Sequence, residues 1–336
     1  MSQTNASRAD IRLGATLYAY TNEFHRRQFT LEGLIAEVAR LGQGPGLEIV
    51  GFQSLKGFPD VSDDTAARFK DCVAQHQLEL TCLGINADAH LRADRSRTRE
   101  ELVDFHARQI RSAAKLGFPL VRYQYAAGPE VIRELAPLAR DLNVKLGLEV
   151  HAPHTVDHPE VLAYREMYAQ VNSPYLGFIP DFGASAKAVP QRYLRYYRGN
   201  GIPEFAIEAA LDLWAEDSDP FTKRPRYLEW AEKAGVDRGR ALEIHTIFGL
   251  FSRQPLRNWL EIMPQVIHVH GKFYEVDETG TDQAIDYASI LDVFVEGGYR
   301  GYISAEWEGH QVTDDPGFPE VERFQKMLKR LLAERQ

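Results

Sequence analysis

Four apolar runs in the second half of the chain end in residues that can bind a metal ion or move a proton. Three carboxylates gathered in one buried site would repel one another, and their desolvation would be costly without a cation. The runs end Leu148-Glu149-Val150-His151, Ile179-Pro180-Asp181-Phe182-Gly183, Ile267-His268-Val269-His270-Gly271-Lys272 and Ser304-Ala305-Glu306-Trp307-Glu308. From them we predict four metal ligands: Glu149, Asp181, His270 and Glu306. Three oxygen donors and one imidazole suit Mn²⁺ best, with Co²⁺, Fe²⁺ or Mg²⁺ as alternatives.

Each of these residues also has an ordinary structural explanation. A single carboxylate at the end of a strand is more often an ion-pair partner, and a single histidine in a strand is more often a hydrogen-bonded core residue. Four such residues at corresponding depths on four successive runs favour one shared metal site. Water or substrate oxygens would fill the remaining coordination positions.

His151 is the predicted catalytic base. Residues two apart on a strand face the same way, so His151 shares a face with Glu149 and lies one step nearer the strand end. An imidazole at that place can take a proton from substrate at neutral pH. The alternative is a loop residue without a catalytic role, since His154 and His158 follow closely.

Further polar residues lie beyond the predicted ligands or at the ends of other runs. Lys272 and Glu308 each follow a predicted ligand by two residues. Lys272 is predicted to stabilise a developing oxyanion or to balance the negative charge, and a structural ion pair is the alternative. Asn86 and Gln124 end the third and fourth runs, and with Glu308 they are the predicted substrate contacts.

Eight apolar runs rich in β-branched and aromatic residues predict eight strands. Longer amphipathic segments separate them, which is typical of repeated βα units and a parallel sheet. Eight such pairs without an obvious linker favour one closed (β/α)8 barrel over a doubly wound sheet, with catalytic residues at the carboxyl ends of the strands. The runs are 11–20, 46–54, 79–86, 120–125, 145–151, 175–183, 266–274 and 301–309.

The segments between the runs carry helix signals. Residues 30–41 place apolar side chains at helical spacing, and the helix is expected to end at Gly42. Thr98 and Glu101 form a capping box that opens a helix running to Gly117. Pro129 and Pro159 stand where the first turn of a helix tolerates proline.

The sixth and seventh runs are separated by residues 184–265, far more than one crossover helix needs. We predict that the whole chain, residues 1–336, is one barrel domain and that 184–265 is a helical insertion on its active-site face. Helices are expected near 203–216 and 225–234, together with a basic, aromatic loop at 193–198. The basic, aromatic cluster at 193–198 is interpreted as a helix packing on the barrel or as a subunit interface, and alternatively as a lid over a flat aromatic substrate.

Composition limits the class of protein. The 336 residues include 44% hydrophobic and 26% charged side chains, which is ordinary for a globular protein. With 39 basic and 48 acidic residues, the formal net charge is −9, which argues against nucleic acid and anionic membrane surfaces as partners. Cys72 and Cys82 are too few for a disulfide scaffold and are predicted to be buried thiols. The N-terminal ten residues are polar, and no stretch is apolar enough to span a membrane, so a cytoplasmic protein is expected.

The order Glu, Asp, His, Glu on the last four strands resembles the xylose isomerase-like superfamily of sugar isomerases and epimerases, along essentially the whole chain. In that superfamily the second histidine of the His-x-His strand is the ligand, which selects His270 over His268. Ketose 3-epimerases carry a substrate-binding histidine where this chain has Ala184 and an arginine where it has Val276. Both departures argue against simple ketose epimerisation.

Several segments resemble the alpha subunits of bacterial C-glycoside deglycosidases: 48–54, 148–154, 178–183, 248–252 and 305–310. The resemblance implies a metal-dependent complex with a small β-sandwich-like beta subunit. It implies cleavage of the carbon–carbon bond between a 3-oxo-glucosyl group and a flavonoid-type aglycone, a lyase reaction. It also implies that the reaction proceeds by enolate formation and elimination, and that His151, as the histidine of Glu-x-His, is the base.

Three other functions remain as alternatives. A metal-dependent keto-sugar or cyclitol isomerase, epimerase or dehydratase would use the same metal and differs only through Ala184 and Val276. A catalytically silent sugar-binding subunit is disfavoured by the four intact ligands. An apurinic endonuclease would need more histidines at the strand ends and a basic face.

Overall fold

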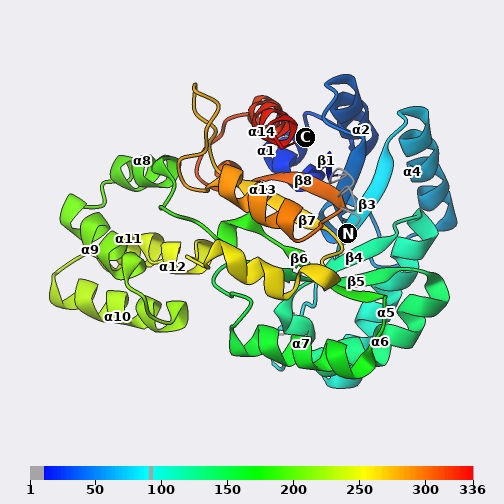
Figure 1. Cartoon of the computed structure of the whole chain (residues 1–336), viewed down its shortest axis with the longest axis horizontal. Helices are drawn as coiled ribbons and strands as arrows, with labels where there is room; N and C mark the ends of the chain where they lie inside the picture. The colour runs from blue at the N-terminus through cyan, green and yellow to red at the C-terminus, as the bar shows by residue number, and fades with distance from the viewer. Residues whose placement is uncertain (1–10, 91–93, 336) are drawn as a thin grey trace, which may run out of the picture.

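In the computed structural model, which describes residues 11–90 and 94–335, eight parallel strands form a nearly closed barrel. Neighbouring strands pair in the order β6-β5-β4-β3-β2-β1-β8-β7, and bridges from Phe178 to Val266 and from Asp181 to His270 join β6 to β7. The predicted (β/α)8 barrel is therefore confirmed (Figure 1). The strands are β1 (Ile11–Thr16), β2 (Gly46–Val50), β3 (Glu79–Gly84), β4 (Leu120–Tyr123), β5 (Lys145–Val150), β6 (Leu176–Pro180), β7 (Val269–Phe273) and β8 (Gly301–Trp307).

The strands are shorter than the apolar runs that predicted them. At three carboxyl ends the run continues as a short helix: η1 (Leu17–Tyr20), α3 (Gly51–Ser54) and η3 (Phe182–Ala184). Most of these residues are buried, so they keep an apolar composition although the backbone has left the sheet. Composition alone cannot separate a buried strand from a buried helical turn.

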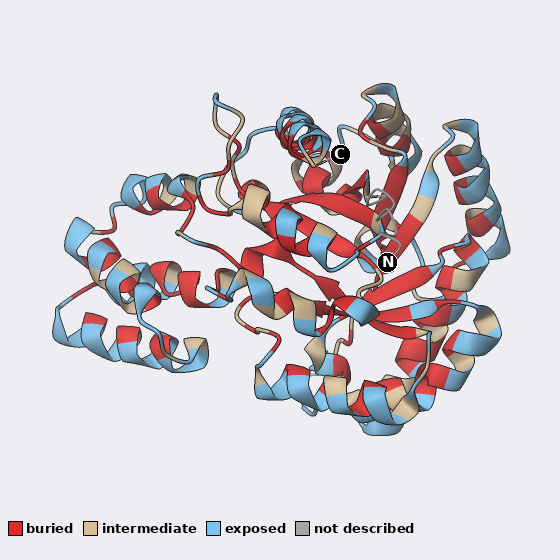
Figure 2. Cartoon of the chain, viewed as in Figure 1, coloured by how far each residue is buried: buried red, intermediate tan, exposed pale blue. Residues whose placement is uncertain are grey.

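Helices surround the barrel and bury one face each against it (Figure 2). The predicted capping box is confirmed, because the Thr98 side chain accepts from the Glu101 amide and the Glu101 side chain accepts from the Thr98 amide. Gly117 ends that helix at φ +92°, a conformation that glycine adopts without strain. The surrounding helices are α1 (Thr21–His25), α2 (Leu31–Arg40), α4 (Asp63–Gln75), α5 (Arg99–Leu116), α6 (Pro129–Leu142), α7 (Pro159–Val171), α13 (Tyr287–Glu296) and α14 (Gly317–Ala333), with short turns at η2 (Tyr125–Ala127) and η6 (Gly309–Gln311).

Between β6 and β7 the chain forms a group of helices that extends to one side of the barrel (Figure 1, left). They are α8 (Gln191–Gly199), α9 (Glu204–Ala215), α10 (Pro220–Lys233), α11 (Arg238–Ile244) and α12 (Ile247–Leu250), followed by η4 (Leu256–Glu261) and η5 (Met263–Gln265). Residues 193–198 do not form a loop: they lie in α8 and bury Tyr193, Leu194 and Tyr197, which agrees with the interpretation of this cluster as a packed helix. The helix predicted to start at Pro225 starts at Pro220, where the Asp219 side chain caps it.

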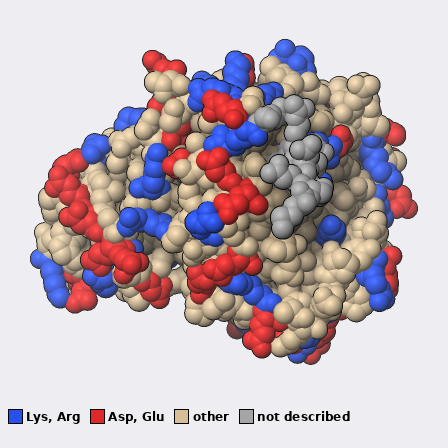
Figure 3. Space-filling view, viewed as in Figure 1, with Lys and Arg blue, Asp and Glu red and all other residues tan. Residues whose placement is uncertain are grey.

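Other predictions concern the surface and the termini. Cys82 is buried as predicted, whereas Cys72 is only partly buried. The N-terminal residues 1–10, predicted to be polar and without a membrane segment, lie outside the described residues. Across 11–90 and 94–335, no helix has the length and apolar character needed to cross a membrane. Figure 3 shows basic and acidic side chains interspersed on one face.

Candidate functional site

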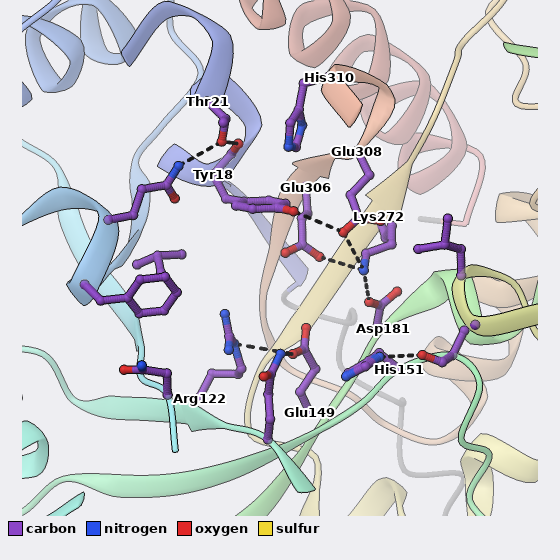
Figure 4. Close-up of a pocket in the computed structure, with 18 of the residues that line it drawn as sticks. Tyr18, Thr21, Arg122, Glu149, His151, Asp181, Lys272, Glu306, Glu308 and His310 are labelled. Carbon is purple, nitrogen blue, oxygen red and sulfur yellow. Dashed lines mark hydrogen bonds and ion pairs between the residues drawn. The ribbon is translucent and has the colours of Figure 1, made fainter. Parts of the chain in front are cut away.

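The four predicted metal ligands meet at the carboxyl ends of β5 to β8. One ligand-type atom from each of Glu149, Asp181, His270 and Glu306 lies within 4.8 Å of the others, and all four residues are buried. Figure 4 shows Glu149, Asp181 and Glu306 pointing toward one centre from different strands. Because the strands are parallel and in register, residues at corresponding depths on separate strands reach the same layer of the barrel.

The electrostatics of this cluster fit a cation. Burial raises the pKa of Asp181, and it raises the pKa of Glu306 to about 8. Burial acts the same way on Glu149, but Arg122 and His270 outweigh it and hold that pKa well below its usual range. Within the described chain, Glu306 Oε2 is buried without a hydrogen-bond partner. Three crowded carboxylates with an imidazole beside them form a suitable donor set for a divalent metal.

Lys272 supplies positive charge at the edge of the cluster. Its Nζ lies 2.6 Å from Asp181 Oδ2, 3.2 Å from Glu308 Oε1 and 3.7 Å from Glu306 Oε2. Burial would lower the pKa of Lys272, but Asp181 and Glu308 raise it well above its usual range, so the amine is protonated. The ion pair that the sequence left as an alternative is present, and Lys272 also lines the central pocket.

His151 lines the same pocket with one ring nitrogen engaged. Its Nδ1 lies 2.6 Å from the Ala152 carbonyl oxygen, which can only accept, so Nδ1 is the donor (Figure 4). A neutral His151 therefore has its lone pair on Nε2, which is the form a general base needs. The neighbouring His154 has a different role: its ring stacks on Tyr125 at 3.6 Å between centroids and its Nε2 pairs with Glu160.

The three predicted substrate contacts also line the pocket. Gln124 Nε2 donates to Glu149 Oε2 at 3.5 Å, a long bond beside the metal cluster. Asn86 is fixed from behind by Gln109, which bonds both its backbone amide and its carbonyl oxygen. Glu308 is held between Lys272 and the Tyr18 hydroxyl.

Sequence reasoning missed several charged and aromatic residues of the site. Tyr18 and His310, which lie at the ends of β1 and β8, line the pocket with their rings 4.8 Å apart. Arg122 on β4 lies 3.4 Å from Glu149 Oε2, and Glu48 on β2 bonds His270. A charged residue inside an apolar strand was the available signal for Arg122 and Glu48, since buried charges are rarely unpaired.

The pocket has a volume of about 770 Å³, within the range of small-molecule sites. One wall is polar and contains Tyr18, Lys272 and Glu308. Apolar side chains contribute elsewhere, including Val50, Leu250 and Phe52, the last of which is 56% exposed. The pocket can therefore hold a polar group at the ligand cluster and an apolar group nearer its mouth.

Comparisons with known proteins agree with this architecture. The model of the xylose isomerase-like TIM barrel family matches residues 35–333. The chain is 39% identical over 333 residues to the 3'-dehydrocarminate deglycosidase alpha subunit of a Microbacterium species, covering 96% of each protein. It is 41% identical over 307 residues to a C-glycoside deglycosidase alpha subunit of Arthrobacter globiformis, covering 88% of this chain and 83% of that protein.

A solved structure shows the same fold at low sequence identity. The IOLI protein, crystallised with a bound zinc atom, superimposes with a TM-score of 0.55 at 12% identity, over 96% of this chain and 98% of that one. The family model and the identity to the two relatives extend over most of the chain, and their names and fold indicate an enzyme that acts on sugars. The chain belongs to the xylose isomerase-like TIM barrel family and, within it, to the C-glycoside deglycosidase alpha subunits.

Proposed function

We propose that this chain is the alpha subunit of a metal-dependent C-glycoside deglycosidase. The proposed reaction is a lyase reaction that cleaves the carbon–carbon bond between a 3-oxo-glucosyl group and a flavonoid-type aglycone. The observation that carries the proposal is the pairing of a four-residue ligand cluster with the free Nε2 of His151 in one pocket. The names of two relatives, a C-glycoside deglycosidase alpha subunit and a 3'-dehydrocarminate deglycosidase alpha subunit, support a C-glycoside as the substrate.

Glu149, Asp181, His270 and Glu306 would hold the metal, for which we propose Mn²⁺. Three oxygen ligands and one nitrogen ligand suit Mn²⁺, while Co²⁺, Fe²⁺ and Mg²⁺ accept similar sets. When bound, the ion supplies Lewis acidity that polarises the substrate ketone. The polar wall beside it would place the sugar, with Glu308 and the Tyr18 hydroxyl as hydrogen-bonding groups for its hydroxyls.

His151 would act as the base. A ketone at C3 acidifies the proton on C2, and His151 Nε2 is positioned to accept a proton within the pocket. In the elimination the C2–H bond breaks, a C1=C2 double bond forms and the bond from C1 to the aglycone breaks. The aglycone carbon then takes a proton, which protonated His151 can return. Lys272, already a cation, would stabilise the negative charge that develops on the C3 oxygen.

Asn86 and Gln124 would contact the substrate from the opposite side of the pocket. Gln109 fixes the backbone of Asn86, and the side-chain amide of Asn86 donates to Asp88, so the side chain is oriented before substrate arrives. Gln124 reaches Glu149 only weakly, so its amide can turn to a sugar hydroxyl. Both contacts would orient the sugar and would affect KM more than kcat.

The helices between β6 and β7 are the proposed docking region for a small beta subunit. Large apolar side chains on α9 to α11 are 36 to 49% exposed, namely Phe205, Phe221, Trp230 and Leu242. Phe205 and Trp230 pack edge to face, 6.3 Å apart, and form one exposed aromatic pair. Exposed aromatic clusters of this kind are typical of subunit contacts.

The experiment measures aglycone release from a 3-oxo-C-glucosylated isoflavone or flavone by mass spectrometry. The chain is loaded with Mn²⁺ and co-expressed with the genomic neighbour of beta-subunit size. We expect release by the wild-type complex and none above background in His151→Ala or Glu149→Ala. His158→Asn is the matched control, because asparagine can keep the acceptor that caps α7. Absence of release by the metal-loaded complex, together with isomerisation of a free keto sugar, would favour the isomerase or epimerase alternative.

A further inference from the structure

Glu48 on β2 lies beneath the ligand cluster and bonds two histidines at once. Its Oε1 lies 2.9 Å from His270 Nε2, and its Oε2 lies 2.9 Å from His268 Nε2. Glu48 is 1% exposed, so its carboxylate is shielded from bulk solvent. Because an ionised carboxylate only accepts, both Nε2 atoms are donors.

The Glu48 bond determines which nitrogen of His270 faces the other carboxylates. With Nε2 donating to Glu48, the Nδ1 atom is directed at Glu149 Oε1, 2.6 Å away, and at Glu306 Oε2, 3.4 Å away. A histidine that ligates through one nitrogen commonly donates its other N–H to a carboxylate, which fixes both the tautomer and the ring orientation. Glu48, His270 and the ligand cluster have this arrangement.

A local irregularity of the sheet lies directly beside Glu48. In the pairing of β2 with β3, Leu47 lies opposite Leu80, but Glu48 lies opposite Cys82, so Thr81 is skipped. The register therefore shifts between Leu47 and Glu48. Such bulges occur beside active sites, where they change the direction of a side chain.

The second oxygen of Glu48 is fixed from the other side. His268 Nε2 lies 3.0 Å from Ser304 Oγ as well as 2.9 Å from Glu48 Oε2. Ser304, His268, Glu48 and His270 thus form one buried chain of polar contacts. A carboxylate that served only to neutralise charge would not need both of its oxygens fixed by ring nitrogens.

We propose that Glu48 is a positioning residue of the metal centre: it fixes the tautomer and ring orientation of His270 so that Nδ1 is the ligating atom. The inference rests on the proposed function, because it requires that the four-residue cluster bind a divalent ion. Glu48 does not itself touch the ion or the substrate. Loss of such an outer partner weakens metal binding by about 10- to 100-fold in known sites.

The test measures metal affinity and coordination in the full chain. Glu48→Gln keeps the shape of the side chain but can accept from only one of the two Nε2–H groups. We expect the Kd for Mn²⁺, measured by electron paramagnetic resonance, to rise by about 10- to 100-fold. The visible absorption of the Co²⁺-loaded variant should also change, since it reports the nitrogen ligand. Glu320→Gln is the matched control: Glu320 is an equally buried carboxylate on α14 that pairs with Arg192 and Arg323.

A second variant keeps the test informative if Glu48→Gln does not fold. His268→Leu removes the donor to Glu48 Oε2 and leaves the Glu48–His270 bond in place. We expect a smaller rise in Kd, between that of wild type and that of Glu48→Gln. A Kd within twofold of wild type and an unchanged Co²⁺ spectrum in the folded variants would overturn the inference. Absence of divalent-ion binding by the wild-type chain would instead overturn the metal centre on which the inference depends.

Discussion

Replacement of Lys272 by methionine should make the stability of the protein depend on the metal. The Lys272 ammonium lies 2.6 Å from Asp181 and 3.2 Å from Glu308, with all three side chains nearly buried. At 2.6 Å and an effective dielectric constant of about 20, the attraction to Asp181 is about 6 kcal/mol before desolvation. Measured losses on breaking one buried pair are about 3–5 kcal/mol, because the remaining charge has no partner.

A loss of this size lowers the Tm of the protein by a measurable amount. Unfolding of 336 residues at about 2.1 cal/mol/K per residue gives an entropy near 0.7 kcal/mol/K, so 3–5 kcal/mol lowers Tm by about 4–7 °C. A divalent ion at the ligand cluster would stabilise the carboxylate that Lys272 leaves unpaired. We therefore expect the full loss in EDTA-treated Lys272→Met and less than half of it with saturating Mn²⁺, by differential scanning calorimetry.

Lys223→Met is the matched control for this measurement. Lys223 is also a buried lysine, but it lies on α10 and donates to the carbonyl oxygens of Trp214 and Glu216. Its replacement should lower Tm equally with and without Mn²⁺. If Lys272→Met likewise loses the same number of degrees under both conditions, the assignment of Asp181 and its neighbours to a metal-binding cluster is wrong.

Three further outcomes are expected. His151→Ala should lower kcat by about 100- to 10,000-fold and leave the Kd for Mn²⁺ within twofold of wild type, and a comparable loss of metal affinity would contradict a role as base alone. Burial raises the pKa of Asp282 to about 7. In the unfolded chain this carboxyl ionises near pH 4, so the free energy of unfolding falls as pH rises from about 4 to 7 and is nearly constant above pH 7. Urea unfolding should show a loss on the order of 4 kcal/mol over this range, and Asp282→Asn should abolish it. Trp230→Asp should weaken binding of the beta subunit in sedimentation velocity without affecting Mn²⁺ affinity, and an unchanged complex would exclude this docking region.

The barrel was predictable because each of its strands coincides with an apolar run in the sequence. Each run marks a strand at the correct place, and the capping residues Thr98 and Glu101 mark the start of α5. The carboxyl ends were not predictable, since the turns at 17–20 and 182–184 are largely buried and apolar, like the strands before them. The α8 segment was taken for a loop because of its basic residues, although Tyr193, Leu194 and Tyr197 already have the spacing of a buried helical face.

The ligand cluster was predictable because one sequence shows both which strand a residue belongs to and how far along that strand it lies. Glu149 and Glu306 lie near the ends of their runs, on β5 and β8, and closure of the barrel brings these unpaired strands to one site. The partners of the cluster depend on register between strands that one sequence does not record. Glu48 bonds His270 although β2 and β7 are not neighbours in the sheet, and Arg122 reaches Glu149 from the neighbouring strand.

The charges found through the structure strengthen the argument for a divalent ion. Counting Glu48 and Glu308 with the three predicted carboxylates, five buried acidic groups lie in or next to the ligand cluster, against the fixed cations Arg122 and Lys272. Burial raises the pKa of Glu306 to about 8, and the negative charges of Glu149 and Asp181 add to this shift. Two positive charges at the cluster would remove most of the excess, whereas a neutral ligand would leave it unchanged. The charge balance and the donor set therefore favour the same occupant, and the charge balance extends the argument to residues that are not ligands, namely Glu48, Glu308, Arg122 and Lys272.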